Sequence, residues 1–340
     1  MSFELNASYK ARIFYEPNGS QVYRFPKGNI FKAMDLLLKL KVNIITSVSS
    51  NAPDFQACNA IENISLIRNS NEIVWSLSGQ ALALLFTYDK THGVAAASNA
   101  AIAGAVANNV AGQHFMHCRF YPDDAPKPHD FGVDTRFADY ELRVKWRDIT
   151  AAGTLFGTIG SSITTTNTNN YLEVELKALG LRPNPIDGSP DGLTNIAPLV
   201  MGLREERGEV NSSNTQYEIN LPDGQDYRNI LLYTTHVANT LQEIGVNTVL
   251  NNKIKLYDTQ NRIKQDRLAE MVREQTSQKW GLGSAVPAGL YDFALTPYGA
   301  ISDAIRSSAV TDLRLGLDVT KLANATYVRT IYVTQERQAA

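Results

Sequence analysis

The sequence QVYRFPKG at residues 21–28 has a counterpart, YEINLPDG, at residues 217–224. Each is a strand-like segment that mixes polar side chains with β-branched or aromatic ones and ends in Pro-X-Gly. The two prolines, Pro26 and Pro222, are 196 residues apart. This pair indicates that one strand and the turn after it occur twice in the chain.

Other strand-like segments repeat in the same order. Residues 63–66 and 71–73 match residues 253–256 and 261–263 at a spacing of 190, residues 142–146 match 313–317 at 171, and residues 171–176 match 327–332 at 156. The spacing only falls along the chain. We therefore expect two copies of one β fold, of which the first has longer loops.

Length and composition agree with two domains that associate with copies of themselves. The chain has 340 residues, more than one domain usually contains. Charged residues make up 19% of it, below the roughly 25% typical of soluble domains, which suits a protein that buries much of its surface. The net charge of −2 gives no basis for binding a phosphate backbone, so no direct sequence-specific contact with nucleic acid is expected.

Two cysteines, Cys58 and Cys118, are too few for a disulfide framework. We expect both to be reduced and buried, in keeping with assembly in a cytoplasm. Residues 1–6 show no signal-peptide pattern. The alanine-rich segment from Val94 to Gly112 contains three asparagines, whose amides are costly in lipid, so a packing segment is expected there and not a membrane span.

Hydrophobic periodicity predicts mostly strands, with one short helix in each half. Residues 38–44 alternate strictly, which predicts a strand with its apolar side chains on one face. Strand-like segments on both sides of the turn residues 17–19 predict a hairpin. The spacing of apolar residues predicts helices at residues 72–85 and 261–275.

Three prolines and two glycines between residues 183 and 192 exclude regular structure and mark a linker. We expect an N-terminal arm at residues 1–9, a first domain at residues 10–182, a linker at residues 183–198 and a second domain at residues 199–336. Short strands with few helices suit a Greek-key sandwich and exclude parallel βαβ units. The predicted fold class is all-β, with two tandem eight-stranded jelly rolls and a short helix in each.

Histidine and cysteine at residues 114–118, with His92 and His129 nearby, form the strongest metal candidate, because zinc prefers imidazole and thiolate ligands. On a strand, however, His114 and His117 are an odd number of residues apart and point to opposite faces. We therefore expect these histidines to be satisfied within the fold or exposed.

Two loops contain residue types that bind ligands in other proteins. The first contains four carboxylates, Asp123, Asp124, Asp130 and Asp134, without the spacing of a calcium-binding loop. The second is glycine-spaced, at residues 153–160, but it leads into a Ser/Thr-rich segment and lacks the helix that a phosphate cradle needs. The first is expected to be a solvated surface loop and the second a flexible loop.

No familiar catalytic motif occurs in the chain. Adjacent carboxylates such as Glu205 and Glu206 diverge on a strand and do not face one reacting atom. No catalytic residue, metal ligand or cofactor site is therefore predicted, and the chain is not expected to be an enzyme.

Residues 13–17 and 22–25, followed by residues 61–67 and 73–79, are similar to the opening of the N-terminal coat domain in small membrane-containing phages. With the tandem sandwiches and the short linker, they make the chain resemble the double jelly-roll major capsid proteins. That family, of the adenovirus lineage, builds the shells of tailless icosahedral viruses with an internal membrane, such as the corticoviruses and tectiviruses.

The resemblance implies a structural subunit of the virion that is assembled in the host cytoplasm and has no active site. It implies a homotrimer of six sandwiches, which makes a roughly hexagonal tile, with neighbouring capsomers, penton or minor capsid proteins and an underlying viral membrane as partners. Residues 94–112 and 161–170, as insertions of the first copy, are expected to form an outer tower or the trimer contact.

Two other classes of protein use the same kind of sandwich. One is a tandem carbohydrate-binding protein, and the other is a glycoside hydrolase. A hydrolase requires two carboxylates that converge in a cleft lined by aromatic residues. The sequence offers no obvious pair, although residues distant in sequence can meet in the fold.

Overall fold

The computed structural model describes residues 5–45, 55–87, 109–122, 125, 130–157, 163–179, 199–238, 241–246, 248–259, 263–281, 286–296, 304–309 and 312–338. Several expectations lie outside these residues, namely the linker at 183–198, most of the alanine-rich segment, His92, His129, Asp123 and Asp124. The described part is mostly β-structure with two α-helices, and neither helix is long and apolar enough to cross a lipid bilayer.

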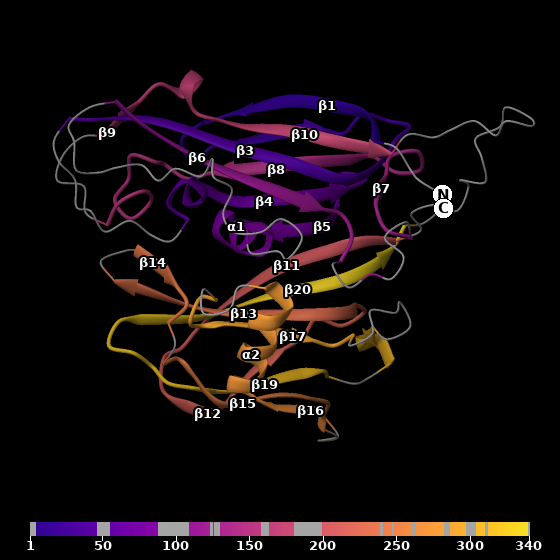
Figure 1. The fold of residues 1–340 in the computed structure, drawn as a ribbon, viewed down its shortest axis with the longest axis vertical. Helices are drawn as coiled ribbons and strands as arrows, with labels where there is room; N and C mark the ends of the chain where they lie inside the picture. Colours follow the sequence, from indigo (N-terminus) through magenta and orange to yellow (C-terminus); the bar gives the residue numbers. More distant parts are fainter. Residues whose placement is uncertain are drawn as a thin grey trace, which may run out of the picture.

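The first half folds into two antiparallel sheets that enclose a core (Figure 1). One sheet, in the order β1-β10-β3-β6, contains β1 (Leu5–Phe14), β3 (Ile30–Ile44), β6 (Asn109–Arg119) and β10 (Tyr171–Leu179), with the short β7 (Val133–Asp134) and β9 (Ile163–Thr165) paired to β3. The other, in the order β2-β8-β4-β5, contains β2 (Ser20–Arg24), β4 (Ile61–Arg68), β5 (Glu72–Leu77) and β8 (Tyr140–Trp146). Helix α1 (Gly79–Thr87) follows β5.

The second half has the same plan. One sheet, in the order β11-β20-β13, contains β11 (Leu199–Glu209), β13 (Asp226–Ala238) and β20 (Ala325–Arg337), with β14 (Leu241–Ile244), β17 (Leu290–Ala294) and β18 (Ile305–Arg306) paired to β13. The other, in the order β12-β19-β15-β16, contains β12 (Asn214–Asn220), β15 (Leu250–Tyr257), β16 (Ile263–Leu268) and β19 (Arg314–Val319). Helix α2 (Ala269–Trp280) follows β16.

The pairing registers of the two halves are equivalent. Tyr171 pairs with Lys39 in the first half and Tyr327 pairs with Thr235 in the second, so β10 and β20 repeat at the predicted spacing of 156. The helices α1 and α2 begin 190 residues apart, the spacing predicted for the strands before them. The same strand order and register in both halves confirm the internal repeat.

One predicted spacing is wrong by two residues. Leu142 pairs with Leu66 on β4, and the residue that pairs with the equivalent Leu256 on β15 is Leu315, at a spacing of 173. The sequence match placed Leu313 there, at 171. Because side chains alternate along a strand, an error of two residues leaves every side chain on the same face, so the hydrophobic pattern could not reveal it. Between equivalent strands of the two halves, the spacing still falls along the chain from 196 to 156, although it rises locally by one residue.

Each half is an eight-stranded jelly roll. The chain passes from β1 in one sheet to β2 in the other, returns for β3, crosses again for the β4–β5 pair, and continues to alternate through β6, β8 and β10. Two sheets of four strands connected in this way are the double Greek-key arrangement of a jelly roll. The all-β prediction, with one short helix in each half, is confirmed.

The predicted hairpin at the start of the chain is wrong. Strands β1 and β2 flank residues 17–19, but β1 pairs with β10 and β2 pairs with β8, in different sheets. The turn is therefore an arch between the two sheets. Its geometry is fixed by Tyr15, which is buried and donates its backbone N–H to Asn170 O at 2.9 Å.

The predicted helices begin too early in both halves. Residues 72–77 form β5 and residues 263–268 form β16, and the helices start only at Gly79 and Ala269. A strand followed at once by a helix spaces its apolar residues much as one long helix does, which explains the error. The β-branched and aromatic residues of EIVWSL (72–77) favour the strand.

The expected N-terminal arm at residues 1–9 is partly strand. Strand β1 begins at Leu5, which pairs with Leu179 at the end of β10. Residues 5–9 therefore belong to the edge of the first sheet and lengthen it beyond the expected domain start at residue 10.

The core of the first half contains the side chains that the alternation predicted. Leu38, Leu40, Val42 and Ile44 are each at most 1% exposed. Both cysteines are free and buried, as expected, and burial raises the pKa of both thiols. Thiols held in this way are poor nucleophiles and act as small apolar side chains.

The repeated Pro-X-Gly turn provides a test of the fold. Gly28 and Gly224 have φ angles of 81° and 76°, and a Cβ at either position would meet no atom within 4 Å. We expect Gly28→Ala and Gly224→Ala each to lower the free energy of unfolding by about 1 kcal/mol, because only backbone strain opposes the methyl group. Urea denaturation measures this, with Lys27→Ala as the control. Losses that differ strongly between the two glycines would contradict the equivalence of the turns.

Candidate functional site

The two jelly rolls are joined edge to edge by a short parallel pairing of β5 with β11. Leu203 pairs with Trp75, and Arg204 pairs with Ser76. The indole N–H of Trp75 also donates to Met201 O at 2.6 Å. The pairing makes one continuous sheet from β2-β8-β4-β5 of the first half and β11-β20-β13 of the second.

The β11-β20-β13 sheet is buried on both faces. Leu231 and Tyr233 belong to the core of the first half, whereas Leu232 and Tyr332 belong to the core of the second. Every residue of β20 from Val328 to Gln335 is buried accordingly. Helix α1 lies between the two halves in Figure 1, and four successive side chains of this helix have no exposed surface, namely Ala81, Leu82, Ala83 and Leu84.

A buried ion pair fixes this junction. Arg329 Nη1 on β20 lies 2.8 Å from Glu205 Oε1 on β11, and the two side chains are 4% and 8% exposed. The Tyr233 hydroxyl donates to Glu205 Oε1 at 2.5 Å. From the first half, the backbone N–H of Ser78 donates to Glu205 Oε2 at 2.7 Å, and Arg329 Nη2 donates to Gln242 Oε1.

The charges of this pair are maintained by their surroundings. Burial by itself raises the pKa of Glu205, but the charge of Arg329 and hydrogen bonds from Tyr233 and Ser78 bring it below its ordinary value. Glu205 is therefore ionised and holds the N-terminal end of α1 against the second half. Nothing in this arrangement provides a proton acceptor near an exposed nucleophile, so its role is structural.

The C-terminal end of the described chain ties the same two halves together. The Gln338 amide donates to Gly132 O at 2.6 Å in the first half and to Leu199 O at 3.1 Å in the second. Its carbonyl oxygen accepts a hydrogen bond from the Tyr140 hydroxyl at 2.8 Å. The last strand therefore crosses the junction and locks it.

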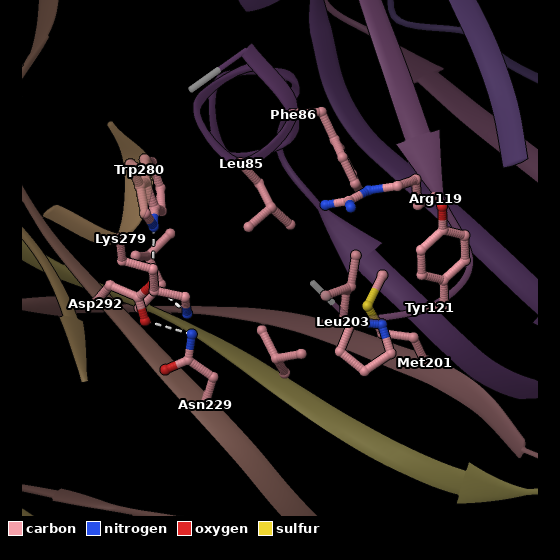
Figure 2. A pocket seen from close by; sticks show the side chains of 13 residues that line it. Leu85, Phe86, Arg119, Tyr121, Met201, Leu203, Asn229, Lys279, Trp280 and Asp292 are labelled. Carbon is pink, nitrogen blue, oxygen red and sulfur yellow. Dashed lines mark hydrogen bonds and ion pairs between the residues drawn. The ribbon is translucent and has the colours of Figure 1, made fainter. Parts of the chain in front are cut away.

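A cavity of about 50 Å³ remains in the junction, between α1, β6, β11 and α2. Figure 2 shows Asp292 on one side of it, held by Lys279, Trp280 and Asn229, with Arg119 and Tyr121 on the other. Lys279 Nζ lies 2.7 Å from Asp292 Oδ2, and the indole N–H of Trp280 donates to the same oxygen at 2.8 Å.

The cavity is too small for an organic ligand. A water molecule occupies about 30 Å³ in the liquid, whereas ligand pockets measure about 300–1,000 Å³. Asp292 is paired on each of its carboxylate oxygens, so it is not available as a base. The cavity is a packing gap in the junction.

The histidine and cysteine candidates do not converge. On β6, His114 and Cys118 are buried, and His117 points to the opposite face, where its Nδ1 lies 2.5 Å from Asp35 Oδ1. The ring of His114 packs edge-on against Phe55, with centroids 5.7 Å apart. Within the described residues, no three His, Cys, Asp or Glu side chains are placed to hold a metal ion together.

The expectation of a solvated surface loop is wrong for the described part of the first loop, because Asp134 lies in β7 and is 2% exposed, and the second loop is also buried at Phe156, which is 1% exposed. Asp134 Oδ2 lies 2.5 Å from Arg136 Nη2, in an ion pair that closes a turn. Gly153 has a φ of 84°, and its N–H donates to Phe156 O at 2.8 Å. The latter is a tight turn, and the next described residues, 163–165, form the strand β9.

Glu205 and Glu206 diverge, as predicted. Glu206 lies on the opposite face from Glu205 and accepts a hydrogen bond from the Tyr332 hydroxyl at 2.8 Å. Sequence analysis did not single out Arg329 or Gln242. A lone arginine within the otherwise uncharged run of residues 327–334, YVRTIYVT, was the signal for a buried ion pair.

Comparison with solved structures agrees with this architecture over the whole chain. The crystal structure of the STIV MCP superposes with a TM-score of 0.68 and 11% identity, covering 97% of each chain. The major capsid protein P2 from bacteriophage PM2 gives 0.57 and 12%, covering 98% of this chain and 100% of that one. The PBCV-1 VP54 structure, fitted into a reconstruction of the virophage Sputnik, gives 0.60 and 11%, covering 100% and 98%.

The chain has a double jelly-roll fold. A related structure of the Sulfolobus turreted icosahedral virus gives a TM-score of 0.66 at 12% identity. No protein-family model matches the sequence, and no curated protein is significantly similar to it. The similarity is therefore one of fold.

The buried ion pair gives a prediction for stability. Glu205→Gln leaves the Arg329 guanidinium buried without a counter-charge and is expected to lower the free energy of unfolding by about 3–5 kcal/mol at pH 7. The exposed Glu206→Gln is the matched control, with an expected loss below about 1 kcal/mol.

The pH dependence of that loss has a definite sign. The pKa of Glu205 is lowered in the folded chain, so its contribution is present above the unfolded value, near 4.3, and is lost as the pH falls through the folded value. Urea denaturation from pH 7 to pH 3 should show the gap between wild type and Glu205→Gln shrinking. A constant gap would contradict an ionised Glu205.

His114 gives a separate prediction. Burial lowers its pKa to about 4, whereas an unfolded histidine titrates near 6.5. The unfolded chain therefore takes up the proton first, and stability is lost as the pH falls from about 6.5 to about 4. His114→Leu should make this decline shallower by up to about 1.4 kcal/mol per pH unit. Urea denaturation at several pH values tests it, with His236→Leu as the control, and an unchanged slope would refute it.

Proposed function

We propose that the chain is the major capsid protein of an icosahedral virus and forms the virion shell through pseudo-hexagonal homotrimers. The observation that supports this most is the match of the whole chain, at TM-scores of 0.68 and 0.57, to the STIV MCP and to the major capsid protein P2 from bacteriophage PM2, with at least 97% of each partner covered.

The internal repeat supports a hexagonal tile. Three chains of two jelly rolls each supply six similar units, although the trimer has only three-fold symmetry. Strands that run side by side within each sandwich keep most of their hydrogen-bonding edges covered, and the loops remain free to meet solvent or other components. Shell formation then needs no chemistry beyond self-association.

The assignment to a particular type of virus rests on the sequence. Similarity of residues 13–17, 22–25, 61–67 and 73–79 to the coat domain of membrane-containing phages supports a tailless bacteriophage with an internal membrane, assembled in the host cytoplasm. Neighbouring capsomers, penton or minor capsid proteins and the viral membrane are the partners that go with this assignment. We propose residues 5–182 and 199–336 as the two jelly-roll domains, with residues 183–198 as the linker. The first domain starts at Leu5 and not at residue 10, because β1 begins there.

A hydrolase is the less favoured alternative. A groove of about 430 Å³ on the outer sheet of the second half is lined by Glu218, Tyr257 and Asp318. The Tyr257 hydroxyl donates to Glu218, and Arg314 Nη1 lies 2.9 Å from Glu218 Oε2. These contacts hold the pKa of Glu218 below its ordinary value, whereas a glycosidase acid needs a raised one.

Light scattering during size-exclusion chromatography tests the proposed function. The purified chain is expected to elute as a trimer, with a mass three times that of the chain, and to remain trimeric on heating to temperatures that unfold ordinary domains. Incubation with polysaccharides should release no reducing sugar. A monomer that binds or cleaves glycans would overturn the proposal in favour of the carbohydrate class.

A further inference from the structure

The joint between the two jelly rolls uses two strands whose repeats are unpaired on one side. Within the chain, β5 of the first half pairs with β11 of the second. The repeat of β5 is β16, and the repeat of β11 is β1. Among the described residues, β16 pairs with β15 alone and β1 with β10 alone. The chain therefore presents a second, unused copy of both sides of its own joint.

Two apolar side chains at the junction of β16 and α2 are exposed beside the unused β16 edge. In the first half, Ser78 lies just before α1 and is half-buried, and Ala81 in the first turn of α1 has no exposed surface. Their repeats, 190 residues later, are Leu268 and Met271, which are 46% and 56% exposed. These two side chains line an open groove with Arg267 and Gln275. Apolar groups of this size are expected to be covered in the assembled protein.

The unused β1 edge belongs to a face that repeats the one receiving α1. Glu205 and Arg329, which hold α1 in the internal joint, are repeated by Lys10 and Glu173, so the charges are exchanged. This face is solvent-accessible. Lys10 Nζ lies 3.5 Å from Glu175 Oε2, and its own side chain is 63% exposed. Glu175 and Asp35 on this face are the repeats of Ile331 and Leu231, so the receiving surface is charged at positions where the internal one is apolar. This suits subunits that fold separately before they meet.

We propose that β16 and α2 of one copy of this chain dock on β1 and the adjacent outer face of the β1-β10-β3-β6 sheet of the next copy, in the geometry of the internal β5–β11 joint. Leu268 and Met271 are then buried at this contact. The inference rests on the proposed homotrimer and specifies which of its surfaces meet. Because the contact is head-to-tail, its repetition closes a ring when the rotation allows, and three chains close the ring of six rolls.

The internal register predicts which residues face each other between subunits. Leu203 pairs with Trp75 inside the chain. Their repeats are Ser8 and Gln265, which should pair in the same parallel register across the subunit contact. Neighbouring strands lie about 4.8 Å apart, within the range that a disulfide can bridge.

The test is oxidative cross-linking of the full chain carrying Ser8→Cys and Gln265→Cys. Non-reducing denaturing electrophoresis should show covalent dimers and trimers, and no ladder beyond three. Each single variant should give no such product, because the native Cys58 and Cys118 are buried. The matched control pairs Gln265→Cys with Val22→Cys, an exposed position on the edge strand β2, and should not cross-link.

The outcomes separate this contact from the proposed function. A trimer by light scattering that yields no Ser8–Gln265 cross-link, or the same yield from the Val22 control, overturns the docking geometry and leaves the capsid proposal standing. A chain that is monomeric throughout overturns both. A ladder beyond three overturns the closed ring.

A second variant tests the same contact without introduced cysteines, so the proposal stays testable when the double-cysteine chain does not fold. Met271→Glu should raise the concentration at which the trimer dissociates by at least tenfold, because it places a charge in the proposed contact. Phe137→Glu, at a side chain that is 57% exposed on another surface, is the control and should leave the trimer unchanged. Equal behaviour of the two variants contradicts the docking surface.

Discussion

The structure depends on one sheet that must be covered on both of its faces. Strands β11, β20 and β13 carry apolar side chains above and below the sheet, so a single sandwich cannot satisfy them. One face is covered by the sheet of its own half and the other by α1 and the first half. The two jelly rolls are therefore parts of one folding unit, and the buried Glu205–Arg329 pair fixes how they meet. Burying a charge pair adds little stability in itself, but it penalises any other arrangement in which one charge loses its partner.

Much of this architecture could be predicted from the sequence, because alternation and repetition are visible without coordinates. The repeats at spacings of 190 and 156 align strands that hold equivalent positions in the two sheets. What the sequence could not provide was pairing. The residues around the first turn were expected to form a hairpin, since the choice between a hairpin and an arch is made by distant strands β8 and β10. The predicted helix starts were also wrong, because a strand followed directly by a helix spaces its apolar residues much as one long helix does.

The candidate sites also depend on which distant residues meet in the fold, and the sequence does not reveal this. His114 and Cys118 lie on one face of a strand, but the third ligand that a metal needs must come from another strand, and the described fold brings Phe55 there instead. Conversely, no local sequence pattern predicts the junction, because the residues that form it come from β5, β11, β14 and β20, far apart in the chain. Arg329 was the one local sign of it, since a charge in the middle of a buried strand requires a partner.

The last strand, β20, lies at the centre of its sheet and crosses to the first half through Gln338. During synthesis, β1 and β10 can close the first jelly roll once residue 179 has left the ribosome. The face of α1 and β5 that is destined for the junction stays uncovered until the final residues emerge. A nascent or truncated chain therefore displays an apolar surface that the finished chain hides. Exposed surface of this kind favours aggregation, so the position of β20 makes the folding of the first half depend on a strand that is made more than 140 residues later.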